Sequence, residues 1–113
     1  MKITIQTPDF KPSERLMDFV AGQVEKLSVL SDRIIDAQVV LKKEKSATDA
    51  DKVCELKLAI PGNDIFASRQ SATFEDAVTE TIEAVRNQLK KWKDSRNPQK
   101  MRPTPKLGPQ EGA

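Results

Sequence analysis

The chain has 113 residues, enough for one hydrophobic core, and its 19 basic and 17 acidic residues give a net charge of +2. A content of 37% hydrophobic and 32% charged residues is typical of a globular protein with a polar surface. No apolar run approaches the roughly 18 residues of a membrane span, and the first ten residues contain no apolar signal region. We therefore expect a cytoplasmic protein with no membrane partner.

The composition also argues against several kinds of chemistry. The chain has no histidine and one cysteine, Cys54, so zinc sites and Ser-His or Cys-His catalysis lack ligands or a base. Its four glycines form no phosphate-binding loop. The paired carboxylates Asp49 and Asp51, and Glu75 and Asp76, are better explained by a solvated loop and a helix start. We predict no enzyme activity, no metal, no cofactor and no small-molecule substrate.

The spacing of apolar residues predicts six elements in the order β-α-β-β-β-α. Strands are predicted over residues 2–7, 34–44, 53–60 and 65–72. A first helix begins near Ser13 and carries an apolar stripe as far as Leu30, and a second helix follows Thr73 and ends near Lys93. A polar loop over 45–52 and a tight turn over 61–64 separate the last three strands.

This order predicts an α+β fold: a four-stranded sheet with two helices packed on one face. The other face would be open to solvent, with polar residues such as Lys42, Glu55 and Lys57. Within the second strand, alternation places four residues on one side, which are Ile35, Ala37, Val39 and Leu41. Cys54 lies in the next alternating run and is predicted to be a small core residue.

The second helix becomes strongly basic towards its end. Arg86, Lys90 and Lys93 are spaced by four and three residues, which places them on one edge of the helix, and Lys91 adds to the basic end. A rigid helix that carries a cluster of cations favours contact with nucleic-acid phosphates. The alternative is that these lysines only complement the helix dipole and keep the surface soluble.

The remainder of the chain differs in composition. Residues 93–113 contain five basic and two acidic residues, and four of the seven prolines of the chain follow Lys93. We therefore divide the chain into an α+β domain, residues 1–94, and a flexible basic Pro-rich tail, residues 95–113. The single tryptophan, Trp92, has two interpretations. It closes the apolar face of the helix, which we favour, or it stacks on an exposed base.

Three local patterns resemble those of a known family. The first helix has the form L-x-x-F-V followed by K-L, the second strand ends in V-V-L-K-x-E-K, and an I-x-A-S strand precedes a helix ending in Q-L-x-K-x-K. The matching residues are Leu16, Phe19, Val20, Lys26, Leu27, Val39, Val40, Leu41, Lys42, Glu44, Lys45, Ile65, Ala67, Ser68, Gln88, Leu89, Lys91 and Lys93. Over about residues 1–95, the chain resembles the short ribosome hibernation-promoting factors, also called ribosome-associated inhibitors or the sigma-54 modulation protein family.

The resemblance implies a fold like the double-stranded-RNA-binding domain. It also implies binding to the small ribosomal subunit, in the channel used by messenger RNA and the A- and P-site transfer RNAs, so that translation is idled by steric occlusion in starvation or stationary phase. On this hypothesis the protein is a monomer, and six cations contact ribosomal RNA phosphates: Lys26, Arg69, Arg86, Lys90, Lys91 and Lys93. The alternative is a general structured-RNA-binding module of the same fold that is not tied to the ribosome.

Overall fold

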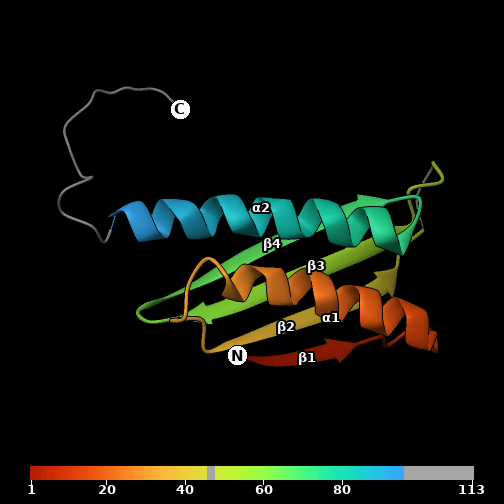
Figure 1. Ribbon diagram of the computed structural model, residues 1–113. Coiled ribbons are helices and arrows are strands. Elements are labelled where there is room, and N and C mark those ends of the chain that lie inside the picture. Colours follow the sequence, from red (N-terminus) through yellow and green to blue (C-terminus); the bar gives the residue numbers. More distant parts are fainter. Residues whose placement is uncertain (46–47, 96–113) are drawn as a thin grey trace.

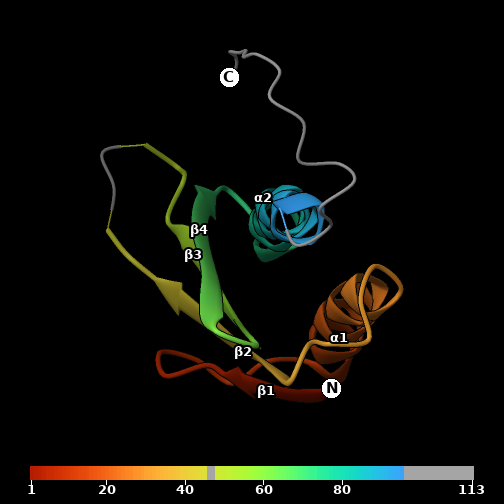
Figure 2. The same cartoon turned by 90° about the vertical axis from the view of Figure 1, so that its left-hand side faces the viewer.

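The computed structural model describes residues 1–45 and 48–95. Six elements follow one another in the predicted order: β1 (Lys2–Gln6), α1 (Glu14–Ser28), β2 (Asp36–Lys43), β3 (Lys52–Ile60), β4 (Asn63–Ser71) and α2 (Phe74–Ser95). The four strands form one sheet in the order β1-β2-β3-β4, with β1 parallel to β2 and the other pairs antiparallel. Both helices cover the same face of this sheet (Figures 1 and 2), which confirms the predicted α+β fold.

Each helix begins at a hydroxyl cap. The Ser13 hydroxyl accepts a hydrogen bond from the backbone N–H of Leu16 at 3.1 Å, and the Thr73 hydroxyl accepts one from Asp76 N–H at 3.1 Å. These bonds satisfy N–H groups that have no partner inside the helix. Helix α1 ends at Ser28, before the Leu30 end of its predicted stripe, and α2 continues two residues beyond the predicted end at Lys93.

The core lies between the sheet and the two helices. Its most enclosed large side chains come from α1, β2, β3 and α2, and they include Val20, Val24, Leu27, Val39, Leu41, Leu56, Leu58, Val78, Val85 and Leu89. Thr81 is the buried polar residue within the described part of the chain. Its hydroxyl lies 2.7 Å from the Ala77 carbonyl and 3.3 Å from the Cys54 carbonyl, so the hydroxyl hydrogen is satisfied and α2 is linked to β3.

The turn between β3 and β4 is tighter than predicted. Only Pro61 and Gly62 join the strands, because Ile60 already pairs with Asn63. Gly62 has a φ of 78°, and a proline followed by a glycine with positive φ suits the two central positions of a type II turn. The predicted turn residues Asn63 and Asp64 therefore belong to β4.

The prediction for the start of the second strand is wrong. Ile35 was expected on the buried side with Ala37, but its side chain is 59% exposed, whereas the neighbouring Ile34 is buried in the core. Regular pairing of β2 begins at Asp36, and strict alternation of side chains holds only within a regular strand. In the connection that precedes it, the chain turns so that Ile34 fills the core instead.

The opposite face of the sheet carries polar residues, as predicted, and the structure shows that several of them form ion pairs. The Lys42 ammonium lies 3.0 Å from the Glu55 carboxylate and 3.4 Å from that of Glu44, and the hydrogen bond to Glu55 is the main reason that the pKa of Lys42 is raised. Lys57 pairs with Asp64 at 3.6 Å. The charges on this face are therefore largely matched to one another.

Cys54 is buried in the core, as predicted, with 2% of its surface exposed. Burial raises the pKa of its thiol from 9.0 to about 11, because a thiolate would lose its hydration there. The folded protein therefore holds the Cys54 proton over a pH range in which an unfolded chain releases it.

This difference predicts a loss of stability in alkali. Between pH 9 and about pH 11 the unfolded state binds one proton fewer at Cys54 than the folded state, so the free energy of unfolding falls as the pH rises. We expect wild type to lose up to about 1.4 kcal/mol per pH unit across this interval, relative to Cys54→Ala. Urea unfolding of both proteins at pH 8 to 11 measures this difference. Parallel pH profiles for the two proteins would contradict it.

Candidate nucleic-acid interface

The two helices run in the same direction, so their last turns lie at the same end of the molecule (Figure 1). The loop that leaves α1 passes beside the last turn of α2. There the Lys93 ammonium donates a hydrogen bond to the Leu30 carbonyl, a contact between residues 63 positions apart in the sequence. Residues from both helices and from the loop after α1 are therefore gathered at one end.

Four predicted cations lie at this end, and we call Lys26, Arg86, Lys90 and Lys93 the helix-end cluster. At about 100° per residue, the three members on α2 fall within roughly 60° of the helix circumference. Lys26 lies in the last turn of α1, and all four residues are exposed. Among the residues that the structure describes, the lysines in salt bridges are Lys42, Lys52 and Lys57, all on the sheet. The helix-end cluster is thus available to an anionic ligand.

The other two predicted site residues stand apart from this cluster. Lys91 is on the flank of α2 nearest β4, beside Gln88, whose side-chain amide donates to the Phe66 carbonyl at 3.0 Å. Arg69 follows Phe66 by three residues, roughly 10 Å along β4, and its guanidinium donates to the adjacent Ser68 carbonyl at 2.8 Å. Lys91 and Arg69 are both exposed, but they lie on the β4 side of the molecule and do not belong to the helix-end cluster.

The structure adds one cation that the sequence did not single out. Arg33 lies in the loop after α1 and lines the same pocket as Lys93. The Ser31 hydroxyl accepts a hydrogen bond from the Arg33 N–H at 3.1 Å, which shapes this turn. Its position near α2 depends on how the two helices pack, so no local pattern in the sequence indicates it.

A shallow pocket of about 580 Å³ opens between the last turn of α2 and the loop after α1, and we call it the helix-end pocket. Its lining residues are Ser28, Val29, Leu30, Ser31, Asp32, Arg33, Trp92 and Lys93. Trp92 is half-buried and packs against the core, which agrees with the favoured interpretation of this residue. Trp92 also lines the pocket.

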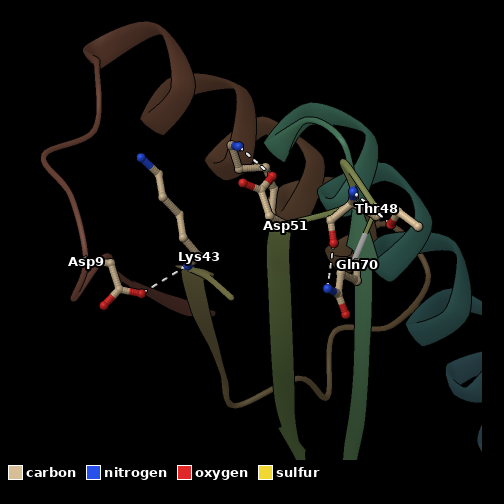
Figure 3. Close-up of polar contacts among 7 residues, drawn as sticks. Asp9, Lys43, Thr48, Asp51 and Gln70 are labelled. Carbon is tan, nitrogen blue, oxygen red and sulfur yellow. Dashed lines mark hydrogen bonds and ion pairs between the residues drawn. The ribbon is translucent and has the colours of Figure 1, made fainter. Parts of the chain in front are cut away.

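The opposite end of the sheet is held together by its own polar contacts (Figure 3). The Asp9 carboxylate accepts from the Lys43 N–H at 3.0 Å, and the Gln70 amide donates to the Ala50 carbonyl at 2.5 Å. Lys52 lies 2.7 Å from the Asp51 carboxylate, and this hydrogen bond lowers the pKa of Asp51. These groups satisfy one another around the ends of the β2–β3 connection, so we assign no ligand to them.

Within residues 1–45 and 48–95, no group of three or more His, Cys, Asp or Glu side chains is placed to hold a metal ion. None of the helices in this part of the chain combines the length and the apolar character needed to cross a bilayer. The predicted tail, residues 95–113, lies outside the described residues except for Ser95, the last residue of α2.

Comparison with known proteins identifies the family and relatives that this chain resembles. Residues 3–97 match the family described as sigma 54 modulation protein / S30EA ribosomal protein. The chain is 32% identical over 94 residues to the ribosome hibernation promoting factor of Escherichia coli K12, covering 83% of this chain and 95% of that protein. It is 29% identical over 94 residues to the factor of the same name from Klebsiella oxytoca, with the same shares covered.

Two solved structures share the fold. A ribosomal subunit interface protein from Coxiella burnetii superposes with a TM-score of 0.72 at 18% identity, over 82% of this chain and 98% of that one. The N-terminal domain of Thermus thermophilus Protein Y gives a TM-score of 0.70 at 19% identity, over 81% and 99% of the respective chains. The family match over most of the chain, together with the 32% identity to the Escherichia coli factor, shows that the chain belongs to the sigma 54 modulation protein / S30EA ribosomal protein family, which includes the ribosome hibernation promoting factors.

Proposed function

We propose that this protein binds the small ribosomal subunit in the channel for messenger RNA and the A- and P-site transfer RNAs, and that it idles translation by occupying that channel. The observation that carries the proposal is the helix-end cluster, in which exposed cations lie in the C-terminal parts of two helices that run in the same direction, without carboxylate partners among the described residues. The names of its relatives, which concern ribosome hibernation and the subunit interface, support the same assignment.

The chemistry of the cluster suits ribosomal RNA. Contacts from lysine and arginine to phosphate oxygens fix position and orientation without reading base sequence. A folded RNA offers phosphates at defined positions. A rigid pair of helices can therefore recognise the shape of the RNA. In this proposal Lys26, Arg86, Lys90 and Lys93 contact phosphates directly, and Lys91 and Arg69 extend the contact along the β4 flank.

Occlusion of a channel requires tight binding but no bond to be made or broken. We accordingly propose a protein without enzyme activity, cofactor or small-molecule substrate, which acts as a monomer in the cytoplasm, where ribosomes work. The basic residues predicted in the tail, residues 95–113, would add to the attraction for RNA in proportion to their charge. The α+β domain would supply the defined contacts.

The first test is co-sedimentation with purified bacterial small subunits across a salt series. Each phosphate contact that is lost reduces the dependence of log K on log salt by about 0.7 to 0.9. We expect the triple variant Lys26→Gln, Arg86→Gln, Lys90→Gln to bind more weakly at low salt, with a slope smaller by about 2 to 3. The matched control is Lys2→Gln, Lys11→Gln, Lys57→Gln, which removes the same charge elsewhere on the surface.

Equal losses in the two triple variants would show that only net charge matters and would contradict the assignment of the interface. Absence of wild-type binding to subunits at low salt would exclude the ribosomal function. If wild type instead bound a free RNA duplex more tightly than intact subunits, the general structured-RNA-binding module would be favoured.

Lys93 is expected to differ from its neighbours in the cluster, because it also joins the end of α2 to the loop after α1. Lys93→Met keeps the aliphatic stem but loses the hydrogen bond to the Leu30 carbonyl, and we expect the free energy of unfolding to fall by about 1 kcal/mol. Lys90→Met is the control, because Lys90 is exposed on the same edge of α2 and makes no such hydrogen bond with the described residues. This variant should stay within about 0.5 kcal/mol of wild type. Urea unfolding distinguishes the two, and equal stabilities would assign Lys93 no structural role.

A further inference from the structure

We propose that the helix-end pocket binds one unpaired nucleotide of RNA, with its base against Trp92 and Val29 and its phosphate at Lys93 and Arg33. This inference rests on the proposed function, because it takes the neighbouring helix-end cluster to lie on RNA. It adds a site for a base to a surface that otherwise contacts only phosphates.

The walls of the pocket suit a flat aromatic ligand. Trp92 packs against the core and is also one of the lining residues of the pocket. Val29 also lines the pocket, and it is 85% exposed although it is apolar. A base in the pocket would contact both apolar residues, and stacking on an aromatic side chain is tolerant of base identity.

The polar groups are arranged for a nucleotide rather than for a simple anion. The pocket adjoins the end of α1, where the last carbonyl groups of a helix have no partner within the regular helix, and it includes the Asp32 carboxylate. Such acceptors repel phosphate but accept hydrogen bonds from the amino groups of bases. Lys93 and Arg33 supply the positive charge, and Lys93 uses one of its three donors on the Leu30 carbonyl.

The size and the position of the pocket fit the same ligand. Its volume of about 580 Å³ lies in the range of pockets that hold small molecules. It shares Lys93 with the helix-end cluster, so an RNA strand that contacts the cluster would pass the mouth of the pocket. Proteins commonly recognise unstacked bases of RNA by stacking them on aromatic side chains and by hydrogen bonds to their edges, and this pocket offers groups of both kinds.

The test uses Trp92 as its own reporter, because the chain has one tryptophan and no tyrosine. Its fluorescence is followed during titration with an eight-residue oligoadenylate, and with an octamer of the same backbone that lacks bases. We expect quenching by the oligoadenylate and binding about tenfold weaker for the abasic strand. An eight-residue oligoglutamate is a third probe, because an acidic peptide is the other ligand that a cationic pocket would accept.

Two matched variants separate the pocket from general effects. Val29→Gln removes the apolar wall without changing charge, and we expect affinity for the oligoadenylate to fall about fivefold with the salt dependence unchanged. Phe66→Gln is the control, because Phe66 is also an exposed apolar residue, at 54%, but lies on β4 away from the pocket. Thermal unfolding of both variants verifies that they are folded.

The possible results distinguish this inference from the proposed function. Salt-sensitive binding to small subunits, with unchanged Trp92 fluorescence and no effect of Val29→Gln, would overturn the pocket and leave the ribosomal function standing. Quenching by oligoadenylate without binding to subunits would support the pocket alone. Equal quenching and affinity for the abasic strand or the oligoglutamate would show an anion site without a base and would overturn the inference.

Discussion

The parallel pairing of β1 with β2 is the constraint on which the rest of the structure depends. Two parallel neighbours need a crossover, so α1 must return across the sheet in the opposite direction. The two hairpins that follow reverse the chain twice, which leaves β4 parallel to β2. Helix α2 then returns in the same direction as α1 (Figure 1). The meeting of the two helix C-termini is therefore a consequence of topology.

This meeting has an electrostatic consequence. Each helix C-terminus carries a partial negative charge of about half an elementary charge, and two of them at one end favour cations there. Lys26 and Lys93 lie in the last turns of the two helices and supply such charge. The two interpretations of the basic residues, dipole compensation and phosphate binding, are therefore compatible. Residues that stabilise the helix ends are the same ones that the fold presents together to a ligand.

Ion pairs are unevenly distributed over the surface of the molecule. On the open face of the sheet, Lys42 and Lys57 each have carboxylate partners, so little unbalanced charge is left there. At the helix ends, among the described residues, the cations have none. A net charge of +2 thus conceals a separation between a balanced face and a basic end. Association with a polyanion is governed by the local density of charge.

Most of the fold could be predicted from sequence because its signals are local. Alternation identifies the strands, Ser13 and Thr73 cap the helices, and a single spacing rule places Arg86, Lys90 and Lys93 on one edge. The errors in the prediction arose at positions whose structure is not determined by nearby residues in the sequence. Ile35 precedes the regular ladder, so alternation did not govern it. The contact of Lys93 with Leu30 joins residues 63 positions apart, and the helix-end pocket exists only because of such contacts.

Trp92 shows why the candidate site is harder to predict than the fold. Trp92 packs against the core and also lines the pocket. The sequence alone offered these as two alternatives, closure of the apolar face or stacking on a base, and neither was complete. Packing holds the ring in place before any ligand arrives, which lowers the entropy cost of stacking on it. The same packing means that replacement of Trp92 would disturb stability and binding together. Val29, which is 85% exposed, touches the pocket without supporting the core, and binding can therefore be separated from folding at that position.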